Sequence, residues 1–286
     1  MNYILKYYYD IEKEDVYYKN GTIYIRNNSD CYIMKEINDS YYVDNISKLL
    51  EESNVKSEFS EIVKAKNNKN YVETGRKKYV LIKITNKYKP KEWLKKLPIS
   101  VELSKYKYIN RSNWYFLWSA KNDFEQIVNK KRKKERTIDE LHEYFIGIAE
   151  NAILYYSLSS SNKNNGLCIA LKRIDEKDKN NPLNLVIDRR ERDIAEMIKY
   201  VYFNNENYET KLNLLMEISI KEKLSFEMIF SRVLYPTKYF DIIEKNNKEY
   251  QENNTLSKLL KYENFLIEVQ NKIKSINKTI KKIDWL

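Results

Sequence analysis

The sequence predicts an α+β protein in which a small β-rich part with one helix is followed by a larger, mainly helical part. Three observations support this. The first third of the 286 residues alternates β-rich runs with turn signals, most of the remainder has helical periodicity, and 42% of all residues are hydrophobic. A chain of this length can bury one sizeable core divided into two lobes. We place the boundary after residue 86, which gives parts 1–86 and 87–286.

The β-rich part contains several short runs that predict strands. They are Tyr3 to Tyr9, Asp15 to Tyr18, Thr22 to Arg26 and Cys31 to Ile37. Asn20-Gly21, between the second and third runs, is typical of a two-residue hairpin turn. Helical spacing of apolar residues over 43–50 predicts one helix, and strands are expected again at Phe59 to Ala65 and Lys78 to Thr85.

The second part is marked by amphipathic helices. Helices are expected at residues 138–156, 224–234, 239–243 and 256–283. A Thr-x-x-Glu capping box at Thr137 begins the first of them, and Pro236 separates the second from the third. The last range is long enough for one helix or a helix pair.

The segment NPLNLVIDRRERDIAEMIKYVYF, residues 181–203, is the most informative one. An apolar strand ends in Asp188, and a helix follows with Asp193 as its predicted N-cap. Such a strand would deliver the Asp188 carboxylate to the rim of a cleft, where a hard oxygen ligand suits a magnesium ion that carries phosphates. These residues alone favour the simpler interpretation, in which Asp188 ends a strand and Asp193 caps a helix without a metal site.

The net charge makes polyanions candidate partners. Lys and Arg exceed Asp and Glu by 52 − 41 = 11, and the dense basic run is KKRKKER, Lys130 to Arg136. A solvated loop before a helix explains this run as well. The aromatic residues of NWYFLW, 113–118, could stack on bases but are more typical of a core. Nucleic-acid binding is therefore the weaker alternative.

Several classes of protein are disfavoured by what the sequence contains. Cys31, Cys168 and the one histidine, His142, cannot assemble an ordinary zinc site, and we expect both thiols to be reduced and buried. His142 is expected to be structural or on the surface. No apolar run is long enough to span a bilayer, and the N-terminal residues lack the pattern of a secretory signal, so we expect a cytoplasmic protein without membrane insertion.

Three segments resemble a known family. HEYFIGIAENAILYY (142–156), the segment 181–203 and LSFEMIFSRVLYPTKYFDIIE (224–244) are similar to spore-coat kinase-like proteins of Gram-positive endospore formers. Those proteins are distant members of the aminoglycoside phosphotransferase and protein-kinase-like superfamily. The resemblance implies a two-lobed protein-kinase-like fold, with a small antiparallel sheet lobe that includes one helix and a larger helical lobe. It also implies association with the spore.

The resemblance also implies roles for individual residues. Lys35, in Tyr-Ile-Met-Lys, resembles the strand lysine of kinases that contacts nucleotide phosphates, and Glu51 or Glu52 would be its acidic partner on the next helix. Asp188 would hold magnesium, with Asp175 as a further ligand. ATP and magnesium are the implied cofactors if the cleft is functional. A lysine between apolar neighbours is also typical of the solvent face of a strand.

One departure from the family pattern bears on activity. The catalytic loop, His-x-Asp-x-x-x-x-Asn in such folds, falls by this comparison on Leu167 to Asp175. The acid position would be Ala170, or Leu171 if the register shifts by one, and neither side chain can accept a proton. We therefore expect a catalytically inactive protein without a cofactor, which acts as a binding or scaffold module for a protein partner in spore-coat or cell-envelope assembly. The alternative is a divergent small-molecule phosphotransferase with Asp175 or Asp178 as its base.

Overall fold

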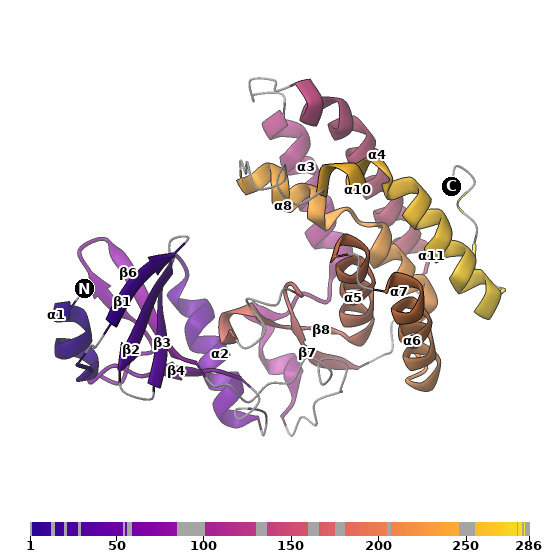
Figure 1. The fold of residues 1–286 in the computed structure, drawn as a ribbon. Helices are drawn as coiled ribbons and strands as arrows, with labels where there is room; N and C mark the ends of the chain where they lie inside the picture. The colour runs from indigo at the N-terminus through magenta and orange to yellow at the C-terminus, as the bar shows by residue number, and fades with distance from the viewer. Residues whose placement is uncertain are drawn as a thin grey trace. The chain divides into compact units, whose positions relative to one another are not determined.

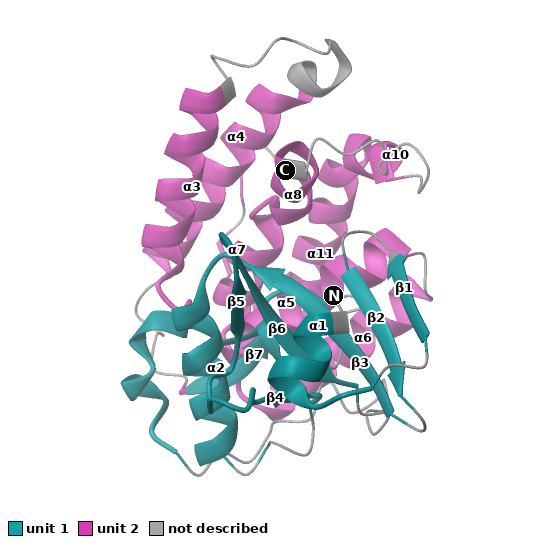
Figure 2. Ribbon diagram, turned by 90° about the vertical axis from the view of Figure 1, so that its left-hand side faces the viewer, with its two compact units in different colours: residues 1–110, 167–188 teal, residues 111–166, 189–286 magenta. Residues whose placement is uncertain are grey.

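The fold is α+β, with an antiparallel sheet and a larger helical part (Figure 1). A computed structural model describes residues 2–12, 15–19, 22–27, 30–53, 55, 59–84, 101–129, 136–159, 166–174, 181–204, 207–245, 255–278, 280–281 and 283. The chain divides into two compact units (Figure 2). Unit 1 comprises residues 1–110 and 167–188, and unit 2 comprises 111–166 and 189–286.

The sheet of unit 1 is antiparallel. Its strands are β1 (Asp15–Lys19), β2 (Thr22–Asn27), β3 (Asp30–Ile37), β4 (Glu61–Val63), β5 (Val72–Thr74) and β6 (Lys77–Lys83), in the order β1-β2-β3-β6-β4, with β5 also paired to β6. Strands are thus found in five of the predicted runs, although β4 is shorter than expected and β5 was not predicted. Asn20-Gly21 lies outside the described residues, but the pairing of Lys19 with Thr22 is that of a hairpin.

The predicted strand Tyr3 to Tyr9 is wrong. This segment forms the short helix α1 (Asn2–Ile4) and the π-helical turn η1 (Leu5–Tyr9), which ends at Asp10 in the left-handed conformation, with φ 59°. Ile4 and Leu5 of these turns, and Ile11 just after them, are buried against one face of the sheet. Burial of these apolar residues outweighs the β propensity of the tyrosines.

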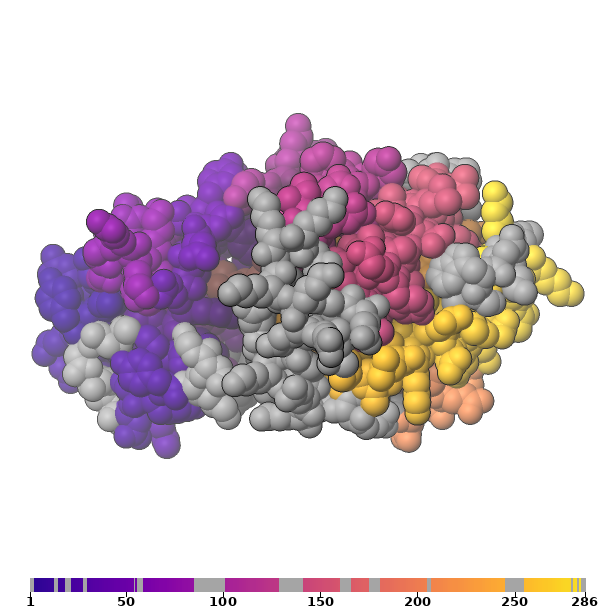
Figure 3. All heavy atoms as spheres, turned by 90° about the horizontal axis from the view of Figure 1, so that it is seen from above, coloured from indigo at the N-terminus to yellow at the C-terminus, as the bar shows by residue number. Residues whose placement is uncertain are grey.

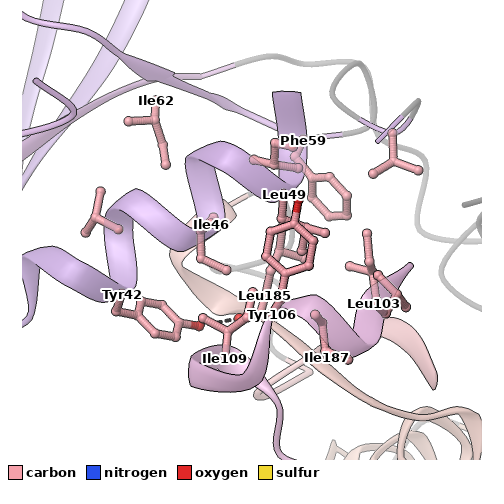
Figure 4. Packing of buried hydrophobic residues seen from close by; sticks show 14 of the residues in the cluster. Tyr42, Ile46, Leu49, Phe59, Ile62, Leu103, Tyr106, Ile109, Leu185 and Ile187 are labelled. Atoms are coloured by element: carbon pink, nitrogen blue, oxygen red, sulfur yellow. Dashed lines mark hydrogen bonds between the residues drawn. The ribbon is translucent and has the colours of Figure 1, made fainter. Parts of the chain in front are cut away.

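The opposite face of the sheet is covered by helix α2 (Ser40–Glu52). Its apolar side joins a core, the α2 core, which also includes residues of β6, of 101–110 and of the β7–β8 hairpin (Figure 4). Segment 101–110 contains the 3₁₀ turns η4 (Leu103–Lys105) and η5 (Lys107–Ile109); the hairpin is β7 (Leu167–Leu171), η8 (Pro182–Asn184) and β8 (Leu185–Arg189).

The shared core explains the composition of unit 1. Ile109 from segment 101–110, Ile169 from β7, and Leu185 and Ile187 from β8 all pack into the α2 core. The unit boundaries therefore do not coincide with the predicted division after residue 86, because two later segments complete the hydrophobic core of the sheet part.

Unit 2 is helical in its described part. Its helices are α3 (Trp114–Asn129), α4 (Arg136–Leu158), α5 (Arg190–Asn204), α6 (Tyr208–Lys221), α7 (Phe226–Leu234), α8 (Thr237–Lys245), α10 (Thr255–Leu260) and α11 (Tyr262–Ile276). The range 256–283 is thus a helix pair.

A buried ion-pair network joins α5 to α7: Arg232 Nε lies 2.9 Å and Lys199 Nζ 3.3 Å from Glu196 Oε1. Removing one partner of such a network is costly, because the remaining charge would be buried without a counter-charge.

Two further observations refine the helical predictions. Helix α5 begins at Arg190, so Asp193 lies in its first turn and is not the N-cap; it forms an ion pair of 3.1 Å with Arg190. An acidic residue in the first turn still favours the helix through the macrodipole. None of the described helices is both long and apolar enough to cross a bilayer.

Candidate functional site

Lys35 lies on the face of the sheet that α2 covers. Side chains alternate along a strand, so Lys35 shares its face with Ile33 and Ile37, and Ile37 packs against the α2 core. Its opposite residue on β6 is Val80, a fully buried member of that core. Lys35 is half-buried beside these residues. Lys35 therefore shares its side of the sheet with apolar residues that belong to the α2 core.

The predicted ion pair between Lys35 and an acid of α2 is absent. Glu51 lies 2.7 Å from Lys64 Nζ, and Glu52 accepts a hydrogen bond from the Tyr106 hydroxyl and lies 3.8 Å from Lys48 Nζ. The physical reason is the position of both acids in the last turn of α2, on its polar side, whereas the side toward the sheet is apolar. Neither acid is placed to fix a lysine that holds phosphates.

Asp188 lies in β8, at the end of unit 1. Leu185 and Ile187 point into the α2 core, so Asp188 shares the opposite face of the strand with Val186, which packs on Cys168 and Ala170. Asp188 is 0% exposed. Its carboxylate is therefore held inside the protein.

The segment predicted to be the catalytic loop is a strand where it begins. Ala170 and Leu171 belong to β7, and Ala170 is buried against Val186. Neither side chain can accept a proton. The interpretation of Ala170 or Leu171 as a vacated acid position stays a prediction. Asp175 and Asp178 lie outside the described residues.

Aromatic side chains share the Lys35 face of the sheet. Tyr24 lies opposite both Tyr17 and Ile33, and the rings of Tyr17 and Tyr24 are stacked, with centroids 4.8 Å apart and planes at 2°. Ile33 is two residues from Lys35, about 7 Å along the strand. A flat aromatic pair near a lysine suits a planar ring that carries an anionic group, as in a nucleotide. This pair was not predicted, because tyrosine is abundant throughout the sequence.

A polar cluster ties the start of α2 to segment 101–110 and to the hairpin. Asp39 accepts hydrogen bonds from the Tyr42 amide at 2.9 Å and from the Tyr108 hydroxyl at 2.6 Å. The Tyr42 hydroxyl donates to the carbonyl of Leu185, and Lys172 Nζ lies 3.7 Å from the centroid of the Tyr42 ring. These contacts fix α2 at its N-terminal end.

A second contact fixes the other end of α2. Tyr106 donates to Glu52, and burial, together with the hydrogen bond to Glu52 and its negative charge, raises the pKa of Tyr106 to about 12. The tyrosine thus remains a neutral donor at physiological pH. Segment 101–110 thus holds both ends of α2, and Glu52 is bonded to Tyr106 and not to Lys35.

The described residues offer limited means of holding a metal. No group of three His, Cys, Asp or Glu side chains is clustered within them. Magnesium is usually bound by one or two carboxylates together with substrate phosphates. The one candidate carboxylate in the described ranges, Asp188, is fully buried, so this donor set does not fit a magnesium ion as it stands.

The other predicted residues have mixed outcomes. His142 is buried in unit 2, with Nδ1 3.1 Å from the Tyr239 hydroxyl, as expected of a structural histidine. Cys168 is buried as expected, whereas Cys31 is exposed on β3, contrary to the prediction. In NWYFLW, Trp114 and Trp118 are core residues of α3. The basic run lies outside the described residues up to Glu135, so its role stays a prediction.

Two solved structures with a similar fold are phosphotransferases. A spectinomycin phosphotransferase in complex with ADP and spectinomycin has a TM-score of 0.59 and 11% identity, over 94% of this chain and 97% of that one. An aminoglycoside phosphotransferase from Alicyclobacillus acidocaldarius has a TM-score of 0.55 and 11% identity, over 93% and 94%. At this identity the similarity shows a shared kinase-like fold.

Sequence comparison identifies the family directly. No curated protein matches the sequence. The family model described as "Spore coat putative kinase YutH" matches residues 2–282, nearly the whole sequence, so the chain belongs to that family.

Proposed function

We propose that this protein is a catalytically inactive kinase-like module that binds a protein partner in spore-coat or cell-envelope assembly. It acts from the cytoplasm, in association with the forming spore, and needs neither ATP nor magnesium for this role. The family description, which names the spore coat, supports the setting. The proposal of inactivity has a separate structural basis.

The observation that carries the proposal is the engagement of the α2 acids. In active kinases a lysine of the sheet and an acid of the following helix pair to set the phosphates. Here Glu51 is paired with Lys64, Glu52 with Tyr106, and Asp44, the remaining acid of α2, with the side-chain amide of Asn70 at 2.8 Å. Within the described ranges Lys35 has no acidic partner. The buried carboxylate of Asp188 points the same way.

The first test is ATP consumption by the purified full chain. With ATP, magnesium and spore-former cell extract, we expect no turnover above the protein-free blank, and no change in Lys35→Ala or Asp188→Asn. Lys77→Ala is the matched control, since Lys77 is an exposed strand lysine whose Nζ lies 2.8 Å from Glu36. Magnesium-dependent turnover that Lys35→Ala and Asp188→Asn abolish, and Lys77→Ala leaves intact, would overturn the inactive assignment.

A second test separates a scaffold from an enzyme in the cell. If the protein works by binding, a host strain that carries Lys35→Ala should assemble its spore coat as the parent strain does, while deletion of the gene should disturb the coat. Coat layers in electron micrographs and spore resistance to lysozyme are the readouts. A Lys35→Ala strain with the deletion phenotype, despite normal protein level, would contradict the scaffold role.

The second candidate is a divergent small-molecule phosphotransferase. Tyr17, Tyr24 and Lys35 lie on one face of the sheet, and this favours the second candidate, because stacked rings and a cation on one surface suit a nucleotide. In that case ATP should raise the melting temperature of the protein only when magnesium is present, and Lys35→Ala should remove the shift. The absence of any shift at millimolar ATP would eliminate this candidate.

A further inference from the structure

β1 is an edge strand with an open side. It pairs with β2 alone, and within the described residues its backbone makes no hydrogen bond to any other segment. Tyr17 and Tyr18 in its centre are 56% and 68% exposed, and indigo atoms of the N-terminal residues lie at the surface in Figure 3. Natural edges are commonly blunted by proline, a bulge or a central charge. β1 has two exposed aromatic residues there instead.

The pairing register shows which backbone groups face the open side. In an antiparallel pair, residues that exchange hydrogen bonds with the partner alternate with residues whose N–H and C=O point away. Lys19 lies opposite Thr22, with two residues between them in the sequence. In a four-residue turn of this spacing, the first and fourth residues are joined by a hydrogen bond. The odd-numbered residues of β1 are therefore bonded to β2, and Val16 and Tyr18 direct their backbone groups outward.

We propose that this edge binds the same edge of a second copy of the chain, antiparallel and about a two-fold axis through Tyr17. Val16 of each copy then lies opposite Tyr18 of the other, and their outward N–H and C=O groups form four hydrogen bonds. In the same register each Asp15 lies opposite residue 19 of the other copy, which is a lysine. The backbone hydrogen bonds and the charges of the strand are two independent arguments for the same register.

The side chains of this register are complementary too. The two copies of Tyr17 meet on the axis as a non-hydrogen-bonded pair, where side chains are closest, and each is already stacked on Tyr24. On the other face, Val16 is only partly buried at the margin of the core beneath α1. Tyr18 of the second copy covers it. Isologous contacts of this kind are the usual basis of homodimers.

The opposite edge of the sheet offers no such surface. It is formed by β4 (Glu61–Val63) and β5 (Val72–Thr74), which lie end to end along β6 and have three residues each. Strands this short are themselves a device against edge pairing. The β1 edge therefore gives a closed dimer, with one continuous sheet across the axis. Because five residues a side bury a small area, the dimer is weak and depends on concentration.

Sedimentation velocity of the full chain, from micromolar to hundreds of micromolar, tests the dimer. Asp15→Lys places like charges opposite each other twice per dimer and should raise the dissociation constant about tenfold or more, as should Lys19→Asp. The double exchange Asp15→Lys with Lys19→Asp should restore the wild-type constant. Glu12→Lys is the matched control, since its exposed carboxylate lies outside β1.

A backbone variant tests the same edge without a change of charge. Val16→Pro removes an outward N–H, which an edge strand tolerates, so the melting temperature should be kept while the dimer is lost. Restoration by the charge exchange together with loss in Val16→Pro supports the proposal. A wild-type chain that stays monomeric over the whole range, or a dimer that the single charge changes and Val16→Pro leave unaltered, overturns it.

Discussion

Asp39 is the residue that starts α2, and its loss should be measurable. Its carboxylate accepts from the Tyr42 amide within the helix and from the Tyr108 hydroxyl outside it. Replacing an N-cap of this type by alanine costs about 0.5–2 kcal/mol. We expect Asp39→Ala to lower the free energy of unfolding in urea by that amount. Asp44→Ala, at an exposed position inside the same helix, should stay within about 0.5 kcal/mol of wild type.

The contribution of Asp39 should depend on pH in a defined direction. Burial raises the pKa of Asp39, but hydrogen bonds from Tyr108 and the amides of Tyr42 and Tyr41, with the charge of Lys172, lower it more, so the pKa lies below its ordinary value. A carboxyl with a lowered folded pKa stabilises the fold above its unfolded pKa of about 3.9, and loses this effect as pH falls through the folded value.

The pH effect can be measured as a difference between two proteins. The gap in free energy of unfolding between wild type and Asp39→Asn should be constant near neutral pH and should narrow as the pH falls below about 4. Asparagine keeps the cap, so the gap reports the charge. A gap that widens on acidification would show that Asp39 is not the stabilising ionised form.

Single residues show what the sequence alone could predict about the site. The alternation of polar and apolar residues was enough to place Lys35 in a strand, and the register then put it on the face of α2. The partners Glu51 and Glu52 could not be predicted, because Lys64 and Tyr106, which engage them, come from segments whose packing has no local signal. Contacts of this kind depend on tertiary structure.

At the scale of elements, α2 is held to β8 by the Tyr42 hydroxyl, which donates to the Leu185 carbonyl (Figure 4). Tyr42→Phe keeps the ring and its contact with Lys172 but leaves a buried carbonyl without this donor, which costs about 1–2 kcal/mol. Tyr41→Phe is the matched control, since Tyr41 is 61% exposed. Equal urea denaturation midpoints for the two variants would refute the assignment.

The sequence predicted those helices and strands that have a strong local pattern of apolar residues and turn signals, and it missed elements without such a pattern. The runs of β1, β2, β3 and β6 have β-forming residues between turn signals, and α2 has a clear apolar stripe. The strand predicted at residues 3–9 is wrong because the same tyrosines suit both a strand and a half-buried helix. The helix forms because its apolar residues pack against the sheet. The apolar run of β7, LCIAL, is typical of a buried strand, whereas the resemblance places the start of a loop motif on it.

At the scale of the molecule, the chain passes between the units three times. It leaves unit 1 after Asn110, returns at Leu167 and leaves again after Asp188. The N-terminal segment 1–110 contains the whole six-stranded sheet but shares its unit and its core with residues 167–188. The resemblance predicted two lobes but could not reveal this interleaving, since the hydrophobic residues of the hairpin look like those of any buried strand.

The interleaving predicts how fragments of the protein will behave. A fragment of residues 1–110 lacks Ile169, Leu185 and Ile187, all buried in the α2 core. Removing one large buried side chain typically costs about 2–5 kcal/mol, and the stability of a whole domain is about 5–15 kcal/mol. The free energy lost with three such residues should therefore exceed the total stability of the fragment. We expect 1–110 to show neither near-ultraviolet circular dichroism nor a cooperative thermal transition.

Restoring the missing strands should restore folding. Residues 167–188 joined to 1–110 by a flexible glycine-serine linker should give a fragment that melts cooperatively, because the α2 core is then complete. The same fusion with Leu185→Asp and Ile187→Asp is the control, and it should remain unfolded because each change would bury an unpaired charge. Cooperative melting of 1–110 alone would show that the sheet and α2 need no help from the hairpin, and that the interleaved chain is not what stabilises unit 1.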